Sequence, residues 1–318
     1  MIELLIQNGS TVYKPIVEGS VKWETDRKGQ PGKLTFSVVP DGIINFQEGN
    51  SVSFKVNDLK VFYGFVFRKE RDKNGIIKVT AYDQLRYLKN KDTYVYSNKT
   101  AGELIQMIAA DFNLRIGTLE DTGFKIASRV EDNKSFMEMI QNSLDLTLQG
   151  KNKLYVLFDD FGRITLKNVE SMKLNMIIDD EAAENFKYQS SIDGDTYNKI
   201  KLSYNNEETG KRDIYIAKDS TNINTWGVLQ YFETIDEKVN GKAKVDALLK
   251  LYNKKKRSLT INNAFGDPRV RAGSSIPISL NLGDVIANNY MVVEKATHTF
   301  SKEDHIMNLT LRGGVINA

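Results

Sequence analysis

Residues 51–67, SVSFKVNDLKVFYGFVF, decide the architecture of this chain. In the first six positions the apolar residues Val52, Phe54 and Val56 alternate with polar ones. A period of two is typical of a β-strand with one buried face, because successive side chains point to opposite sides of a sheet. The apolar run at residues 61–67 is the longest in the chain, and it has the length of a strand rather than of a bilayer-spanning helix.

The same alternation continues on both sides of this stretch. Residues 34–38 (LTFSV) and 77–81 (IKVTA) repeat it, and residues 72–75 (DKNG) carry the Asn-Gly pair that is the strongest short signal for a hairpin. Residues 1–7 have no basic region typical of a signal peptide, so we expect a first strand there. Several short strands with turns between them are typical of a small barrel. We therefore predict an N-terminal β-barrel-like domain over residues 1–92.

The hydrophobic period changes in the middle of the chain. Thr100 and Glu103 have the spacing of a capping box, and an apolar helical face follows to Phe112. A second helix is expected from about residue 132, with Phe136 and Ile140 on its inner face. Residues 154–158 and 163–166 then predict a hairpin. We interpret residues 93–185 as a small α/β domain of two helices and a hairpin.

The last region returns to β structure. Residues 186–318 contain several alternating segments and one amphipathic stretch, which predicts a helix at about 237–256. The fold class expected is therefore α+β and mostly β, with two small β-barrel-like domains and an intervening α/β domain. No tandem repeat is visible, which leaves open whether the first and third regions form similar barrels.

The composition excludes several kinds of chemistry. The 318 residues include no cysteine, which removes disulfides, cysteine nucleophiles and thiolate metal sites. The formal net charge of +3 is too small for a general nucleic-acid-binding surface, and no apolar run reaches bilayer length. Only His298 and His305 can supply imidazole. A cross-strand surface pair is the simpler interpretation of these two histidines than a zinc site.

The acidic clusters do not form a recognisable catalytic or metal motif. Asp159 and Asp160 lie in the predicted hairpin turn, where aspartate is favoured for backbone reasons, and we expect them to be solvated. No phosphate-binding loop, dinucleotide fingerprint or nucleophile elbow occurs. We therefore expect no catalytic residue, no metal ligand and no cofactor.

The charge distribution is more informative. Residues 238–257 carry eight basic residues against one acid, whereas residues 158–195 carry nine acids against four bases. These two charged segments either pair head to tail between the subunits of a ring or are simply solvated. For the basic segment there is a further explanation, because cations in the last turn of a helix complement the helix dipole. The candidate subunit-interface residues are Lys254, Lys255, Lys256, Arg257, Asp179, Asp180, Glu181 and Trp226. Among the large aromatics Trp23, Phe46, Trp226 and Phe265, burial in a core is the commoner outcome.

Long strings of this sequence resemble a known family. They include residues 267–274 (DPRVRAGS), 282–284 (LGD) and 290–300 (YMVVEKATHTF), with 61–67, 79–88 (VTAYDQLRYL), 91–95, 156–162 (VLFDDFG) and 226–232 (WGVLQYF). These strings are similar to the XkdQ/YqbQ family of baseplate hub proteins from contractile phage tails and phage-tail-like bacteriocins (tailocins).

The resemblance implies a structural role rather than an enzymatic one. It implies a homotrimer in which each chain supplies two barrel-like domains, so that a pseudo-sixfold ring faces the sixfold tail tube. The central spike protein would occupy the other face, with other baseplate (wedge) proteins around it. The chain would be made in the bacterial cytoplasm and reside in the baseplate of a virion or tailocin. The family transfers no catalytic residue.

Three alternatives remain at this point. The nearest is the hub of a related contractile injection system. A cell-wall hydrolase would need a cleft with carboxylates of shifted pKa. An oligonucleotide-binding barrel is suggested by 14 Tyr and 15 Phe among many lysines.

Overall fold

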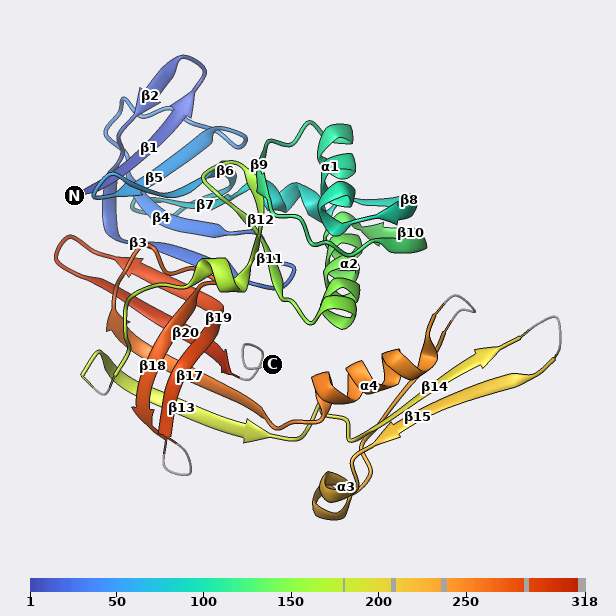
Figure 1. Cartoon of the computed structure of the whole chain (residues 1–318). Helices are drawn as coiled ribbons and strands as arrows, with labels where there is room; N and C mark the ends of the chain where they lie inside the picture. Colours follow the sequence, from blue (N-terminus) through green and yellow to red (C-terminus); the bar gives the residue numbers. More distant parts are fainter. Residues whose placement is uncertain (180, 207–209, 236–238, 283–285, 314–318) are drawn as a thin grey trace.

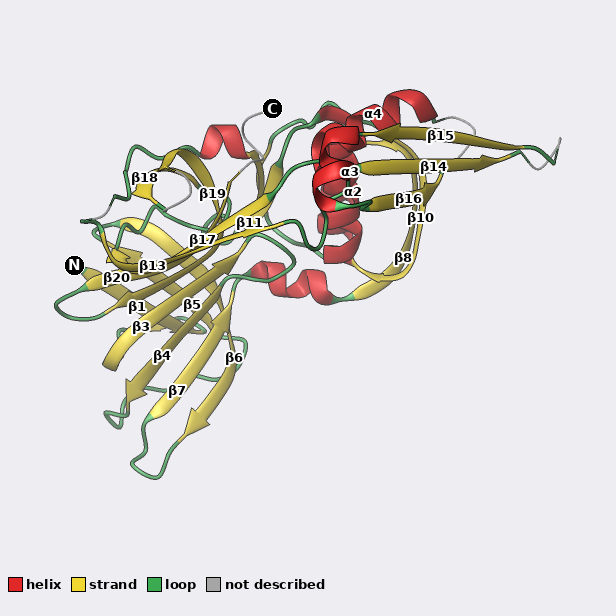
Figure 2. Ribbon diagram, turned by 90° about the horizontal axis from the view of Figure 1, so that it is seen from below, coloured by secondary structure: helices red, strands yellow, loops and turns green. Residues whose placement is uncertain are grey.

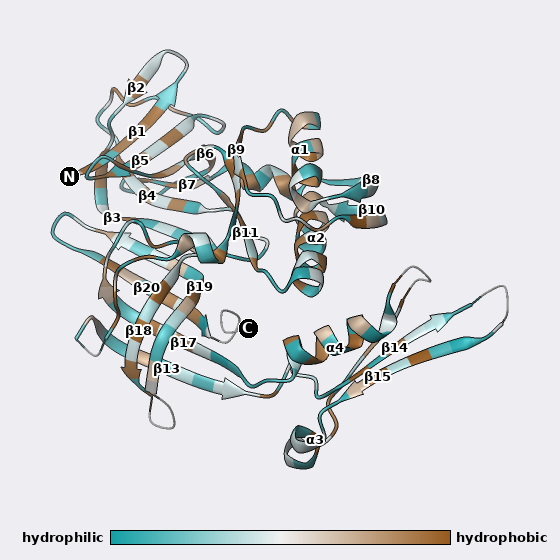
Figure 3. Ribbon diagram, viewed as in Figure 1, coloured by the Kyte–Doolittle hydropathy of each residue, from teal (hydrophilic) through white to brown (hydrophobic). Residues whose placement is uncertain are grey.

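The computed structural model describes the chain except for residues 180, 207–209, 236–238, 283–285 and 314–318 (Figure 1). β structure predominates, as the sequence predicts. Apolar and polar residues alternate along many of the strands, which gives each sheet one face directed to a core (Figure 3).

The N-terminal region forms one curved antiparallel sheet. Its strands are β1 (Ile2–Asn8), β2 (Thr11–Tyr13), β3 (Ile16–Asp26), β4 (Lys33–Val39), β5 (Ser51–Val56), β6 (Leu59–Arg71) and β7 (Ile77–Tyr82). They pair in the order β3-β4-β7-β6-β5-β1-β2 (Figure 1). β2 runs almost directly into β3, so the two ends of this order lie on neighbouring residues of the chain. The unit is therefore barrel-like, although no ladder among the described strands closes it.

The C-terminal region forms a second curved sheet. It contains β13 (Ala183–Ser191), β17 (Lys256–Phe265), β18 (Ser275–Asn281), β19 (Ile286–Phe300) and β20 (His305–Gly313), in the order β13-β17-β20-β19-β18. Just before β13, Lys173 and Ile178 form isolated parallel bridges to β18. Residues 173–191 thus contact β18 first and then β17, which lie on opposite sides of this sheet. Because one segment links the two sides, this unit is also barrel-like.

The two sheets are copies of one five-stranded unit. β3, β4, β5, β6 and β7 occur in the same chain order, and pair in the same spatial order, as β13, β17, β18, β19 and β20. A bulge interrupts β6 between Val66 and Arg68, and a bulge interrupts β19 between Val293 and Lys295. The structure therefore contains a duplication that the sequence does not display as a repeat.

Matching glycines confirm the equivalence of the two units. Gly49 and Gly273, with φ of 87° and 92°, both precede the short strand of their unit. The Gly49 amide donates to the Val66 carbonyl, and the Gly273 amide donates to the Val293 carbonyl, each at 2.8 Å. Both glycines occupy a backbone conformation that L-residues rarely adopt.

The two units join through their strands. β19 pairs with β3 from Lys295 opposite Asp26 to Phe300 opposite Val21, so all these strands belong to one hydrogen-bonded sheet. Each unit keeps its own apolar core, with Phe36 and Phe54 in the first and Leu259 and Val293 in the second.

A helical unit lies beside the first sheet. It contains η1 (Gln84–Lys89), β8 (Lys91–Lys99), α1 (Ala101–Asp111), β9 (Ile116–Leu119), β10 (Ile126–Ser135), α2 (Phe136–Lys151), β11 (Tyr155–Asp159), β12 (Ile164–Asn168) and η2 (Val169–Met172). The predicted capping box of Thr100 and Glu103 is present, and a second one, of Ser135 and Glu138, begins α2. The predicted hairpin is β11–β12.

The segment of chain that connects β13 to β17 forms a further small unit, which projects to one side of the molecule (Figures 1 and 2). It consists of β14 (Lys199–Asn205), β15 (Arg212–Lys218), α3 (Ser220–Trp226), β16 (Gln230–Thr234) and α4 (Gly241–Tyr252). Its core includes Ile200, Leu202 and Val245. The helix predicted at 237–256 is shorter than expected because Lys256 and the residues after it pair with β13 and β20 as strand β17.

Candidate assembly surfaces

The joint between the two barrel-like units is dense in polar and aromatic contacts. Arg27, which is 7% exposed, donates two hydrogen bonds to the Glu294 carboxylate at 3.0 and 2.8 Å. Lys295 pairs with Asp26 at 3.0 Å beside it. The ring of Trp23 stacks on the imidazole of His298. The joint therefore combines backbone pairing with ion pairs and a stacked pair of rings.

The two histidines belong to this joint. His298 Nε2 lies 2.9 Å from the Val270 carbonyl oxygen, and His298 Nδ1 lies 2.9 Å from His305 Nε2. Burial lowers the pKa of His298 to about 3 and the pKa of His305 to about 4, so both rings are neutral at physiological pH. The pair does lie across adjacent strands, as predicted. The expectation of a surface position was wrong for His298, which is fully buried beneath Trp23 of β3.

A second polar cluster links the helical unit to both sheets. Asp83 accepts hydrogen bonds from the Gly32 amide at 2.8 Å and the Leu85 amide at 3.0 Å. Asp159 accepts one from the Gly162 amide at 2.6 Å. Burial raises the pKa of Asp83 well above its usual range, and the neighbouring Asp159 raises it further. The prediction of a solvated Asp159 was therefore wrong.

Arg271 supplies the positive charge of this cluster. Its guanidinium carbon lies 4.1 Å from the ring centroid of Phe158. Its charge partly offsets the effect of burial, which still leaves the pKa of both aspartates raised. Asp83 and Asp159 are each only 4% exposed. Because both carboxylates hold backbone amides and are enclosed, the arrangement fixes the position of the hairpin and is not open to a polymeric substrate. The residues of this buried cluster lie in the strings YDQ, FDDFG and PRVR of the sequence, but only the fold brings these strings together.

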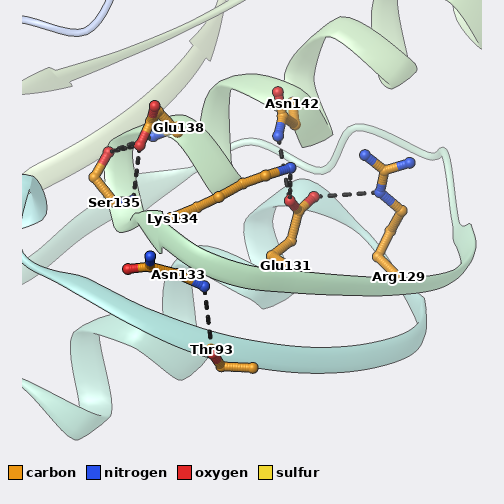
Figure 4. A network of polar contacts seen from close by, with 8 residues as sticks. All are labelled: Thr93, Arg129, Glu131, Asn133, Lys134, Ser135, Glu138 and Asn142. Atoms are coloured by element: carbon orange, nitrogen blue, oxygen red, sulfur yellow. Dashed lines mark hydrogen bonds and ion pairs between the residues drawn. The ribbon is translucent and has the colours of Figure 1, made fainter.

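Glu131 is a third buried carboxylate, and its charge is compensated (Figure 4). It contacts Lys134 at 2.7 Å, Arg129 at 3.2 Å and Asn142 at 3.3 Å. Burial raises the pKa of Glu131, but the hydrogen bonds from Lys134 and Arg129 outweigh burial and leave the pKa lowered. This network holds the bulged end of β10 against α2 and leaves no free carboxylate for chemistry.

The predicted basic residues lie at the junction of α4 and β17. α4 ends at Tyr252, so the four residues 254–257 are outside its last turn, and the dipole explanation for them is wrong. Lys256 pairs with Asp195 at 2.5 Å. Burial lowers the pKa of Lys254, and the nearby charges of Arg312 and Lys250 lower it further. Lys254, Lys255 and Lys256 line a cavity of about 280 Å³ that also contacts Arg27.

The predicted acidic residues separate into different environments. Asp179 accepts hydrogen bonds from the Glu181 and Ala182 amides, which shapes the turn before β13. Asp180 lies outside the described residues. The turn is next to Phe265, whose amide donates to the Ala182 carbonyl and whose side chain is 76% exposed. Asp179 and Glu181 therefore lie at one end of the β13–β17 ladder, beside an exposed aromatic ring.

The basic residues lie at the opposite end of that same ladder. Ala183 pairs with Ala264 near the acidic turn, and Ser191 pairs with Lys256 at the other end. At about 3.3 Å per residue, β13 holds the two ends roughly 26 Å apart. The candidate acidic residues Asp179 and Glu181 are therefore held away from the basic residues within one chain, whereas Asp195, at the far end of the acidic segment, does pair with Lys256.

The predicted aromatic residues divide in the same way. Trp23 and Phe46 are 3% and 5% exposed and belong to the first core. Trp226 ends α3, a helix with no buried side chain, and is itself half-buried. α3 contacts the end of α4 through the hydrogen bond from Asn222 to Asn253. Trp226 thus lies on the same side of the molecule as the basic residues.

The described part of the chain contains neither a metal-ligand cluster nor a helix that could span a membrane. No group of three or more His, Asp or Glu side chains there has the arrangement of a metal site. No helix in that part has both the length and the apolar character needed to cross a bilayer.

The fold matches that of phage tail proteins. The 43 kDa tail protein of prophage MuSo2 from Shewanella oneidensis superposes with a TM-score of 0.71 at 10% identity, covering 97% of this chain and 98% of that one. The tail protein from Neisseria meningitidis MC58 gives 0.69 at 12% identity, covering 99% and 97%. The E. coli type VI secretion system component c3393 gives 0.56 at 9% identity, covering 98% and 76%. At these identities the likeness concerns the fold alone.

Sequence comparison identifies the family. The uncharacterized protein YqbQ of Bacillus subtilis (strain 168) is 30% identical over 97% of this chain and 96% of its own length. The phage-like element PBSX protein XkdQ of the same organism is 28% identical over the same shares. The resemblance predicted from the sequence is thereby confirmed. Since a family model described as YqbQ-like matches residues 21–312, the chain belongs to the YqbQ-like family.

Proposed function

We propose that this protein is a structural hub subunit of a contractile-tail baseplate. Three copies would form a pseudo-sixfold ring that joins the tail tube to the central spike, with other baseplate proteins around it. The observation that carries the proposal is the duplication: one chain contains the five-stranded unit twice, joined edge to edge by β3 and β19. Three such chains supply six similar units, which is the arrangement that a threefold ring needs to meet a sixfold tube.

The charged ends of the β13–β17 ladder support contacts between copies. A head-to-tail ring needs two different, complementary patches on each subunit. The two patches must lie apart within one chain, so that each binds the other patch on a neighbouring copy. The acidic turn with Phe265 and the basic junction after α4 meet this requirement. The candidate contact residues are Asp179, Asp180 and Glu181 at one end, and Lys254, Lys255, Lys256, Arg257 and Trp226 at the other.

The hydrolase alternative receives little support from the carboxylates. Burial raises the pKa of Asp83 and of Asp159, as a hydrolase would require of its acid. Both groups are nevertheless enclosed and bound to backbone amides, so a peptidoglycan strand has no path to them. We therefore infer that the chain is not an enzyme.

A second candidate is the hub of a related contractile injection system. The fold likeness to the type VI component c3393 covers 98% of this chain, which favours a shared architecture. The two candidates differ in the particle and not in the role of the ring, and each places the chain in an assembled tail-like particle.

The experiment that tests the role is the mass and shape of the assembled protein. Size exclusion with light scattering is run on the chain alone, with its cognate spike protein, and with its tail tube protein, and each peak is imaged by negative stain. A three-chain species with a central opening supports the hub ring. Trimerisation only in the presence of the spike indicates templated assembly, and a monomer under all three conditions contradicts the proposal.

A further inference from the structure

The joint inside the chain uses one edge of β19 and one edge of β3. In the duplicated five-stranded unit, the equivalent edges belong to β6 and β13. In the joint between the units, residues 295–300 of β19 have β20 on one edge and β3 on the other. β6 is the counterpart of β19, and its residues 68–71 pair with β7 on one edge only among the described strands. β13 is the counterpart of β3, and it lies at one end of the described sheet order, which has β2 at the other end.

The correspondence fixes residues as well as strands. The bulges align Val66 with Val293, and therefore residues 68–71 with residues 295–298. The ladders to the next strand align β13 with β3. Trp23 faces Leu34 and Leu34 faces Ala81, just as Tyr188 faces Leu259 and Leu259 faces Leu311. Tyr188 thus occupies the position of Trp23.

We propose that β6 of one copy pairs antiparallel with β13 of a second copy, in the register that β19 and β3 use within the chain. Lys295 faces Asp26 and Thr297 faces Glu24 in the internal joint. The equivalent pairs between copies are Arg68 with Ser191, and Glu70 with Gln189. The inference rests on the proposed ring, and it names which strands form the joint between copies.

This pairing completes the ring with six joints of one kind. Three joints are the β19–β3 pairs inside the chains, and three are the β6–β13 pairs between them. An unpaired edge presents backbone donors and acceptors that another strand can bind, and the proposed pairing occupies the edge of β6 and the edge of β13 in each chain. A second copy is favoured over another protein because both edges already have, within the chain, an equivalent that pairs with its counterpart.

Charged side chains lie at or beside both edges. The β6 edge carries the cations Arg68, Lys69 and Arg71 around a single acid, Glu70. The chain that follows β13 carries the exposed acids Asp193 and Asp195, of which Asp195 already pairs with Lys256. The internal joint has ion pairs at the corresponding place, between Lys295 and Asp26 and between Arg27 and Glu294.

The absence of cysteine permits a direct test of the register. The double variant E70C/Q189C places two thiols directly opposite each other across the proposed joint, at the Cα separation of about 4.5–5.5 Å that a disulfide accepts. We expect oxidation of the assembled protein to give a covalent three-chain species on a non-reducing gel. The matched control K69C/Q189C is shifted by one residue, which turns the thiols to opposite faces of the sheet, and it should cross-link at least tenfold less.

A measurement without mutation accompanies the cross-link. Hydrogen exchange is compared between monomer and assembled wild-type protein, and peptides covering residues 68–71 and 188–191 are expected to become protected on assembly. A three-chain species in which E70C/Q189C cross-links no better than the control, and in which these peptides gain no protection, overturns the β6–β13 joint and leaves the hub role standing. A chain that never forms a three-chain species contradicts the hub role itself.

Discussion

Trp23 stacks on His298 with ring centroids 5.1 Å apart, and the two residues face each other directly across the β3–β19 ladder. This contact joins side chains that lie 275 positions apart in the sequence and in different barrel-like units. Trp23 is 3% exposed and His298 is fully buried, so the joint between the units is built like a protein core. The stability of each unit therefore depends on the other.

Trp23→Ala should destabilise the monomer strongly. Removal of a buried tryptophan leaves a cavity and costs about 3–5 kcal/mol. Trp226→Ala is the matched control, because the chain has only two tryptophans and Trp226 is half-buried at the end of a helix with no buried side chain. Urea unfolding followed by circular dichroism should show a loss of less than about 1 kcal/mol for this control. Equal losses for the two variants would contradict the core-like joint.

The neutral histidines should make the protein sensitive to acid. The pKa values of His298 and His305 in the folded chain are about 3 and about 4, below the value of about 6.5 in an unfolded chain. Between pH 6.5 and pH 4 the unfolded chain therefore binds more protons, so the free energy of unfolding falls as the pH falls. Unfolding measured at pH 7, 5.5 and 4.5 should show a shallower pH dependence for His298→Phe than for the wild type. An unchanged slope would argue against burial of the neutral ring.

Arg271→Leu should destabilise the chain by about 3–5 kcal/mol, because it leaves the buried Asp83 and Asp159 without their cation. Arg269→Ala, two residues away and exposed in its pair with Asp267, should cost under about 1 kcal/mol. The pKa of each aspartate is raised in the folded chain, so its ionisation costs stability as the pH rises. The difference between Arg271→Leu and the wild type should thus be larger at pH 8 than at pH 5, and a difference independent of pH would exclude this explanation.

Gly49→Ala and Gly273→Ala test the equivalence of the two units. Both glycines have positive φ, so alanine should cost about 1–2 kcal/mol at either position. At Gly273 an added Cβ would also lie 2.7 Å from a Val156 methyl carbon. At Gly49 an added Cβ would have no atom of the described residues within 4 Å apart from its own chain neighbours. Thermal unfolding should therefore show the larger loss for Gly273→Ala. The reverse order would mean that the second unit relaxes around the new methyl group.

Reversal of charge at Lys254, Lys255 and Lys256 should weaken ring assembly at least tenfold while the fold persists. The pair with Asp195 is lost, but exposed ion pairs contribute under about 1 kcal/mol to stability. The triple reversal of Lys14, Lys125 and Lys302, which are exposed elsewhere, is the control. Light scattering should show the defect most clearly at low salt, where screening is weak. Normal assembly of the first variant would make the basic run a solvated face only.

The sequence by itself determined the local elements. Alternation of apolar residues is a property of neighbouring positions, so strands such as β5 and β7 were predictable, and the side chains of Thr100 and Glu103 suffice to begin α1. The family also followed from the sequence, because the strings that carry the resemblance are continuous.

Only the tertiary structure decided which segments meet. The duplication was hidden because it resides in strand order, bulges and two glycines rather than in residue identity, and a pairing such as β19 with β3 depends on contacts between distant residues. Burial of Asp159 likewise depends on Arg271 and Asp83, which approach it from other parts of the chain. The charge clusters were visible as composition, but the placement of Asp179 and Glu181 at one end of a ladder and of Lys256 at the other is set by the register of β13 on β17.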